Sequence, residues 1–480
     1  MVTMMNPSPR ITISDPTRRN RFWLLLLIAT PGILVIAYFA YVLYLRNILA
    51  TCPPDCRRAD LARAELANIN WAGHDLSEAD LRNANLQNST LAQANLVFTN
   101  LTGANLQNAN LQNANLRGAL LADANLAQAD LRGAQLNGAR LFNANLTQAD
   151  LRGALAKAAD FSGAHLTEMR MDDETFLDAK WQLVWHIVNE PDAARDLRDA
   201  DLSGAYLGNV NLARANLQRA NLTQTNLVGA NLSSANLEYA LLLQTVVDDS
   251  TQLDARWRLV WEILNQVRAE RALANANLSR ANLHAAFLRD ADLTSADLHD
   301  ALLPEADLRR AQLQDANLAG ADLTEANLRA ADLHNTDLRA ANLSGVDLSL
   351  ANLRGAQVDA NTVMLSSWRT VWEILNEGGA EHDFSQRVFD YADLAGADLH
   401  GANLTGAHLS HANLANANLS AANLQDATLT AANLQGVDFT NANLTNADLR
   451  RAQLEGAKLD GAILAGAILP ENVAGTTTSP

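Results

Sequence analysis

The chain has 480 residues, a formal net charge of −17 and two cysteines, which exclude a disulfide-dense scaffold. The acidic balance disfavours binding to nucleic acid or to anionic lipid through charge alone. Hydrophobic residues make up 48% of the chain, and an apolar residue recurs at nearly every fifth position, so simple disorder is also excluded.

The chain begins with a basic tail, residues 1–21, followed by an uncharged apolar run at residues 22–45. At about 1.5 Å per residue this run would reach about 36 Å as a helix, enough to cross a bilayer. A cleaved signal peptide is the alternative, but the run is longer than a usual signal core and lacks a clear small-residue cleavage site. A lipoprotein signal ending at Cys52 fits Arg46 and Thr51 badly. We therefore predict a single transmembrane helix at residues 22–45.

A linker, residues 46–55, follows the predicted helix and contains Cys52 in the motif TCPPDC. More arginines precede the span than follow it, which favours a cytoplasmic N-terminus and an extracytoplasmic repeat domain. Cys52 and Cys56 are close enough to form a disulfide, which would persist in an oxidising compartment. Cys56 also falls five residues before Leu61, so packing in the core is the alternative. Two cysteines alone do not complete a zinc site.

The period of five appears in the stretch LTGANLQNANLQNANLRGALLADANL, residues 101–126. A leucine at every fifth residue makes no single face on a helix, and it alternates between the two faces of a strand. The chain must therefore turn once per five residues. In the unit ANLQN, residues 104–108, Ala104 and Leu106 would point inward and Asn105 outward. Gln107 and Asn108 would form the corner, a position that elsewhere holds Gly103, Gly118, Gly133, Gly138 and Gly153.

Four corners of about 90° would close a coil of about twenty residues, with successive coils about 4.8 Å apart. This repeated A-[DN]-L-x-x unit resembles the pentapeptide-repeat proteins, including cyanobacterial members, over residues 56–470. The resemblance implies an all-β solenoid, a right-handed quadrilateral β-helix. Trp71, Phe161 and Phe439 replace the central leucine. Ala156 stands at a centre with Leu155 beside it, which predicts a bulge or a slip of register.

Three similar interruptions divide the repeat into four arrays. We predict arrays at residues 56–175, 195–249, 270–360 and 382–470, helical inserts at residues 176–194, 250–269 and 361–381, and a C-terminal tail at residues 471–480. The breaks run from Met171 to Leu197, from Val247 to Leu273 and from Val358 to Phe384. Each break is one residue longer than a whole number of repeat units, so each insert shifts the phase by one.

Each insert carries two tryptophans four residues apart within an apolar pattern of helical spacing. The pairs are Trp181 and Trp185, Trp257 and Trp261, and Trp368 and Trp372. The apolar positions are Leu177, Val184 and Val188 in the first insert, Leu253, Val260 and Leu264 in the second, and Met364, Val371 and Leu375 in the third. This pattern predicts an amphipathic helix of about three turns, which either packs its tryptophans on a neighbouring coil or projects them toward a partner.

No catalytic, cofactor-binding or metal-binding constellation is present in the sequence. The aspartates occupy the repeated outward position, and the nearest histidine group, His400, His408 and His411, lacks further ligands. Phe98, Phe142 and Tyr239 occupy outward positions, where single exposed apolar residues are common.

The leading hypothesis is a non-catalytic scaffold, anchored in a membrane through residues 22–45 and bound to an unknown protein partner. The alternative is a DNA mimic that binds a type II topoisomerase, since some pentapeptide-repeat proteins resemble duplex DNA in size and charge. Direct nucleic-acid binding and cofactors are not expected. An enzyme is a third and weaker hypothesis. By resemblance, the compartment would be the periplasm or the thylakoid lumen.

Overall fold

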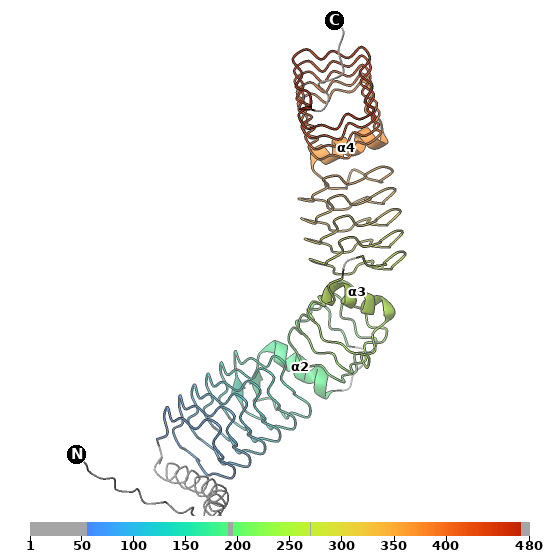
Figure 1. Ribbon diagram of the computed structural model, residues 1–480. Helices are drawn as coiled ribbons and strands as arrows, with labels where there is room; N and C mark the ends of the chain where they lie inside the picture. The colour runs from blue at the N-terminus through green and yellow to red at the C-terminus, as the bar shows by residue number, and fades with distance from the viewer. Residues whose placement is uncertain (1–54, 191–194, 269, 472–480) are drawn as a thin grey trace, which may run out of the picture. The chain divides into compact units, whose positions relative to one another are not determined.

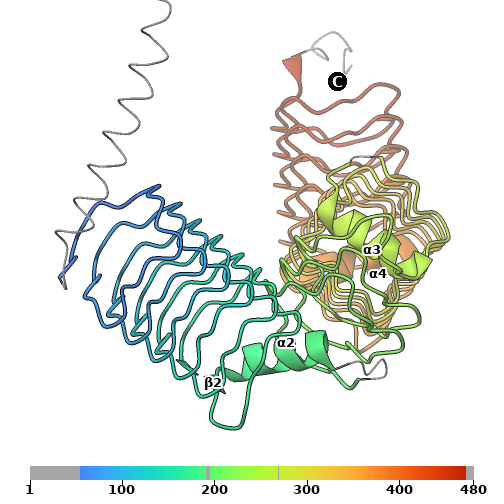
Figure 2. The same cartoon turned by 90° about the horizontal axis from the view of Figure 1, so that it is seen from below.

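The computed structural model describes residues 55–190, 195–268 and 270–471. The chain divides into two compact units, Met1–Gln182 and Leu183–Pro480. Within each unit the chain winds as a stack of coils, interrupted by short helices (Figure 1). Figure 2 shows the coils as open loops with flat sides.

The coils are held together by parallel bridges between residues one turn apart. Asp55 pairs with Asp75, Asp75 with Asn95 and Asn95 with Asn115, so four units of the repeat make one coil. Because the chain turns once per unit, each coil has four sides. The predicted period, the turn at each fifth residue and the four-sided β-solenoid are therefore confirmed, whereas the right hand of the coil stays a prediction.

The unit Ala104–Asn108 shows why this sequence forms a coil, because each of its backbone N–H groups finds an acceptor. Asn105 N donates to Ala84 O of the preceding coil, and Leu106 N and Asn108 N donate to Asn125 O and Ala127 O of the next. Ala104 N closes the preceding corner on Leu101 O. Gln107 N donates to Asn105 Oδ1 at 3.2 Å, an Asx turn. This accounting explains why Asn or Asp precedes the central leucine.

In the regular units the second corner residue has a positive φ, as a type II turn requires at this position. Asn108 has φ of 56° and Gly118 has φ of 65°. Asparagine and glycine tolerate this conformation best, yet Phe98, Tyr239 and Leu350 also adopt it. The corner predicted from residues 107–108 is confirmed.

The interior is built from the central residue and the alanine two positions before it. Ala104, Leu106 and Leu111 are completely buried. Phe161 and Phe439, which replace the leucine, are also buried, as is Trp71. The core is therefore a continuous column of leucine and alanine enclosed by each array.

In the part of the chain that the structure describes, three helices interrupt the coils: α2 (Ala179–Asn189), α3 (Ala255–Asn265) and α4 (Ser366–Asn376), each of 11 residues. They lie inside the predicted inserts and have the predicted length. The predicted apolar patterns were wrong at their first members, however. Leu177, Leu253 and Met364 precede the helices, because each occupies the centre of the last unit of a coil.

The buried face of each helix also differs from the prediction at its C-terminal end. Ile187, Ile263 and Ile374 are buried, whereas the predicted Val188, Leu264 and Leu375 are only half-buried. In α3 the buried residues Trp257, Val260 and Ile263 are three residues apart, so the buried face ends one residue before the predicted one.

The irregularity that the sequence predicts at Leu155 is found instead one coil later, before Phe176. The short strands β1 (Leu155–Ala156) and β2 (Phe176–Leu177) pair Leu155 with Phe176 and Ala156 with Leu177, so these partners lie one residue farther apart than in a regular coil. Ala156 is buried at the centre and Leu155 is exposed, so the unit itself keeps its register. The slip predicted at Leu155 was wrong, because the extra residue is accommodated in the loop just before β2.

The predicted transmembrane segment, residues 22–45, lies outside the described residues. Among the residues that the structure describes, none of the helices is long and apolar enough to span a bilayer.

Candidate functional site

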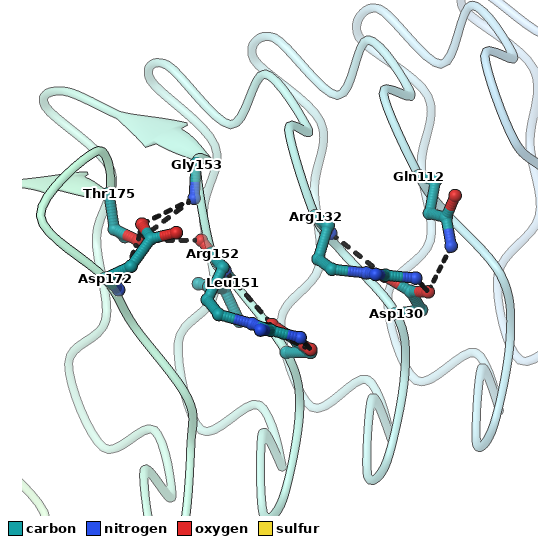
Figure 3. Close-up of polar contacts among 9 residues, drawn as sticks. Gln112, Asp130, Arg132, Leu151, Arg152, Gly153, Asp172 and Thr175 are labelled. Atoms are coloured by element: carbon teal, nitrogen blue, oxygen red, sulfur yellow. Dashed lines mark hydrogen bonds and ion pairs between the residues drawn. The ribbon is translucent and has the colours of Figure 1, made fainter.

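The loop before β2 contains the motif Asp-x-x-Thr, residues 172–175, which closes the last coil of the first array. Asp172 Oδ1 accepts hydrogen bonds from Gly153 N at 2.9 Å and from Thr175 Oγ1 at 2.8 Å. Thr175 Oγ1 also lies 3.1 Å from Leu151 O, so its single proton is shared between Asp172 Oδ1 and Leu151 O (Figure 3). The Thr175 hydroxyl and the Gly153 amide lower the pKa of Asp172 below its ordinary value. The motif therefore inserts one residue while keeping the preceding coil bonded.

The same motif recurs before the other two helices. Thr251 Oγ1 donates to Leu227 O and Thr362 Oγ1 to Leu338 O, which are equivalent to the bond from Thr175. The bridges Asn231 to Gln252 and Asn342 to Val363 again join partners one residue farther apart than in a regular coil. The extra residue in these three loops is the structural cause of the phase shift of one that the sequence predicted.

Helix α3 covers the edge of the last coil of its array with side-chain hydrogen bonds. Asn265 Nδ2 donates to Leu242 O at 2.9 Å, and Asn265 Oδ1 accepts from Gln244 N at 2.6 Å. Trp261 Nε1 donates to Thr245 O at 2.7 Å. The side-chain amide of Asn265 thus supplies the one donor and one acceptor that the backbone of a further coil would supply. It therefore acts as a substitute strand for the backbone of the last coil.

Helix α4 makes the same contacts at equivalent residues. Asn376 Nδ2 donates to Leu353 O at 3.0 Å and its Oδ1 accepts from Gly355 N at 2.6 Å. Trp372 Nε1 donates to Ala356 O at 2.6 Å. Because both helices repeat the same set of bonds, the insert is a defined edge-covering module.

The six predicted tryptophans divide into two groups by burial. Trp181 and Trp257 are buried, whereas Trp185, Trp261, Trp368 and Trp372 are half-buried. Trp181 packs on Phe161 of the first array with ring centroids 6.0 Å apart. This geometry favours packing on the coils, while binding of a partner by the half-buried edges stays a prediction.

On the outer surface, several aspartates pair with an arginine of the same repeat unit. In the first array Arg132 Nε donates to Asp130 Oδ1 at 2.9 Å and Nη2 to Asp130 Oδ2 at 2.7 Å (Figure 3). Arg152 forms the same bidentate pair with Asp150. The guanidinium lowers the pKa of each carboxyl below its ordinary value. Because the two residues are two apart in one unit, the sequence D-L-R forms a clamp by itself.

Elsewhere the outward position holds asparagines that bond along the stack. Asn105, Asn125 and Asn145 form a ladder in which each Nδ2 donates to the Oδ1 of the equivalent residue one coil before it, at 3.1 to 3.3 Å. These ladders occupy the amide groups that would otherwise bind ligands, so they stabilise the stack.

Cys56 is buried and enters a disulfide bond, whereas Cys52, its predicted partner, lies outside the described residues. The histidines of the nearest group are not brought together: His400 Nδ1 contacts Ser420 Oγ at 2.9 Å, and His411 stacks on Tyr391. Among the described residues, the acids, histidines and cysteines form no group of three that could hold a metal ion.

The Asp and Thr of the three loops and the Asn that ends each helix were missed in the sequence. A signal was available, because D-x-x-T and a terminal asparagine recur at the same places in each insert. The two features are polar, however, and the helical pattern was derived from apolar residues alone.

The fold and its inserts define a class of protein: a parallel β-solenoid with five-residue sides, interrupted by helices that cover its coil edges. A family model for pentapeptide repeats matches in eight copies, at residues 134–173, 196–233, 273–310, 306–345, 331–359, 392–430, 422–461 and 432–470. A model for a pentapeptide repeat region matches residues 64–141. These matches cover more than half of the chain, which belongs to the pentapeptide repeat family.

Several solved structures are similar to the chain. HetL, involved in heterocyst differentiation regulation in the cyanobacterium Nostoc sp. strain PCC 7120, is 28% identical, with 62% of this chain and 98% of that chain covered and a TM-score of 0.17. A pentapeptide repeat protein from the Arabidopsis thaliana thylakoid lumen is 28% identical over 25% of this chain and 74% of that chain, with a TM-score of 0.13.

QnrB1, a plasmid-mediated fluoroquinolone resistance protein, is 14% identical over 61% of this chain and 91% of that chain, with a TM-score of 0.15. No curated protein matches the chain. With such TM-scores, the family assignment rests on the family models and on the coil geometry.

Proposed function

We propose that the chain is a non-catalytic interaction scaffold, tethered to a membrane through residues 22–45, whose repeat domain lies on the extracytoplasmic side. The observation that supports this proposal is that the backbone N–H groups of a coil form their hydrogen bonds within the stack. In the unit Ala104–Asn108 every N–H is bonded to a neighbouring coil or within its own turns. Recognition is therefore left to the outward side chains, which a rigid and regular stack presents at fixed spacing.

The chemistry of these outward side chains supports binding over catalysis. The acids of the D-L-R clamps have lowered pKa values, so they stay ionised and paired at neutral pH and are unsuited to general acid catalysis. The disulfide at Cys56 supports an oxidising compartment such as the periplasm or the thylakoid lumen.

A topology map tests the tether and its orientation. A reporter that is active only outside the cytoplasm would be fused after Pro480, and the membrane fraction would be treated with protease from each side. We expect an active reporter and a chain that alkaline washing does not extract, whereas a variant without residues 1–45 should be soluble. An inactive reporter would refute the orientation, and extraction of the full chain would refute the tether. Robust turnover of a substrate by the purified protein would refute the non-catalytic assignment.

The DNA-mimic alternative is disfavoured by the same clamps. A mimic of duplex DNA needs rows of uncompensated negative charge. In this protein, Asp80, Asp130 and Asp150 each pair with an arginine two residues on, at 2.6 to 2.7 Å. A gyrase supercoiling assay with the purified protein distinguishes the two proposals. Inhibition of gyrase by the protein would support the DNA-mimic hypothesis.

A further inference from the structure

One surface of the first unit combines exposed aromatic residues with arginines that lack an acidic clamp. Phe98 is 65% exposed and Phe142 is 49% exposed. Leu120, half-buried, lies on the side between their two corners, and the exposed Arg117 and Arg140 belong to the same three coils. We call these five residues, Phe98, Leu120, Phe142, Arg117 and Arg140, the phenylalanine patch.

The register of the coils places these residues together. Phe98 N donates to Arg117 O, and the Phe98 ring lies over Gly118 so closely that a Cβ there would clash with the ring carbon Cε1. Leu120 is bridged to Arg140 of the next coil, and Phe142 follows Arg140 by two residues. The patch thus crosses three successive coils around one corner and the side that follows it, a rise of about 10 Å.

The phenylalanine at residue 98 is unfavourable for the fold. Its φ of 55° places a bulky side chain in the left-handed region, which costs an L-residue about 1–2 kcal/mol relative to a right-handed or extended conformation. Glycine occupies the equivalent corners at residues 118 and 138. Folding therefore favours glycine at this corner. The exposed ring of Phe98 does not pack in the core, so it does not offset this cost.

The arginines of the patch differ from those of the D-L-R units. Arg132 and Arg152 are each clamped by the Asp two residues earlier, whereas Asn115 precedes Arg117 at that position. Arg140 occupies the outward position itself, one coil away from Asp160. Among the described residues neither Arg117 nor Arg140 forms an ion pair, and both are exposed. The patch therefore carries two guanidinium groups without an ion pair, with Asp160 one coil from Arg140 and Asp123 beside Phe142.

Two further exposed apolar side chains lie on the adjoining side, toward the end of the array. Leu155 is 45% exposed and Phe176 is 44% exposed, and the two are paired across β1 and β2. With Phe98 and Phe142 they are the exposed large apolar residues of the described part of this unit. Apolar exposure is thus confined to two neighbouring sides.

We propose that the phenylalanine patch binds a protein segment in which carboxylates flank apolar side chains. The charge complementarity is direct, because two guanidinium groups that form no ion pair offer bidentate sites to carboxylates beside the exposed rings. Phenylalanine and arginine are enriched at protein interfaces, whereas Lys and Asp are depleted, so the composition fits a protein partner. This inference rests on the proposed scaffold function and specifies its partner.

Substitutions can remove the patch without harming the fold. Phe98→Gly removes the ring and relieves the corner. Asn115→Asp keeps all patch side chains and supplies the missing clamp, so that Arg117 is neutralised in the manner of Arg132. The matched controls are Gln93→Gly, another exposed corner with φ of 59°, and Asn70→Asp, which adds the same charge on another side.

The probe is a displayed library of short random peptides, selected against the full-length protein purified in detergent. We expect enriched peptides to combine Asp or Glu with aromatic or aliphatic residues. Their affinity should fall about tenfold or more for Phe98→Gly and for Asn115→Asp, and should be unchanged for the two controls. Melting temperatures of the four variants confirm that the fold is intact.

Three outcomes would overturn the proposal: no enriched peptide, enriched peptides without carboxylates, or binding that the two patch variants leave unchanged. The last of these would leave the scaffold function standing with its site elsewhere. Sedimentation in the same detergent tests whether a second copy of the chain binds the phenylalanine patch. Self-association that only the patch variants abolish would assign the patch to a second copy of the chain and refute the peptide partner.

Discussion

The asparagine that ends each insert helix gives the most direct test of the edge-covering module. In Asn376→Ala the helix keeps its apolar face and the Trp372 bond to Ala356 O. The variant loses the two bonds that Asn376 makes to the last coil, from its Nδ2 to Leu353 O at 3.0 Å and from Gly355 N to its Oδ1 at 2.6 Å, and also the bond within the helix from Nδ2 to Trp372 O at 2.8 Å. Each such bond contributes a net of about 0.5–1.5 kcal/mol, so we expect the last coil to lose about 1–3 kcal/mol of local stability.

Hydrogen exchange measured by mass spectrometry reports this loss where it occurs. The amide of Gly355 is itself the donor to Asn376, so its exchange follows the bond directly. A loss of about 1–3 kcal/mol corresponds to exchange that is roughly 5- to 150-fold faster in the last coil of that array. Coils several turns away should be unaffected, because each coil contacts only its neighbours.

The matched control is Asn361→Ala, the same substitution in the same insert. Asn361 is exposed and its side chain bonds only to Asp359, two residues before it. Exchange in the last coil should remain at the wild-type rate in this variant. If Asn376→Ala changed the exchange of Gly355 by less than about twofold, the asparagine would not act as a substitute strand and the reasoning would be refuted.

Three further predictions test the core, the corners and the charged surface. Leu106→Ala, at a completely buried centre, should cost about 2–5 kcal/mol in chemical denaturation, and a cost below about 1 kcal/mol would contradict a close-packed interior. Ala421→Gly, at a corner with φ of 60°, should stabilise by about 0.5–1 kcal/mol, whereas Ala422→Gly at the buried neighbour should destabilise. Hydrogen bonds from Thr440, with Lys458 nearby, lower the pKa of Asp438 from 3.8 to about 2, so its contribution is complete above pH 3.8 and is lost as the pH falls through 2. Asp438→Asn should weaken the acid dependence of melting in that range, and an unchanged acid profile would contradict the assignment.

The repeat could be predicted in detail because one physical constraint governs every unit. A period of five admits no helix and no flat strand, so the corner at residues 107–108 and the burial of Leu106 follow from spacing alone. The role of Asn105 could be predicted from the sequence only in part. Its outward direction was predictable, but its bond to Gln107 N depends on the turn geometry that the corner imposes.

The inserts were less predictable, because coil and helix share apolar residues at their junction. Leu177 belongs to the coil by its burial and pairing, yet it stands four residues before Trp181, as a helical neighbour would. Only three-dimensional register separates the two. Similarly, the sequence predicted that Phe98 is exposed. It did not predict that Arg117 lacks an ion pair, because the pairing of Asp130 with Arg132 two residues later is known only from the structure.

The inserts also set how strongly successive arrays of the second unit are coupled. Within an array each side of a coil contributes several backbone hydrogen bonds to the next coil. Across α3 the described backbone contributes one such bond, Tyr239 N to Arg280 O, and across α4 it contributes Leu350 N to Tyr391 O. In a stack whose stability is a sum of nearest-neighbour terms, fewer bonds make a weaker interface. The helices cover the coil edges that this leaves unpaired, so each array is closed against solvent before the next begins. Opening of one array should therefore stop at an insert, which lets a long scaffold lose one segment while the others stay folded.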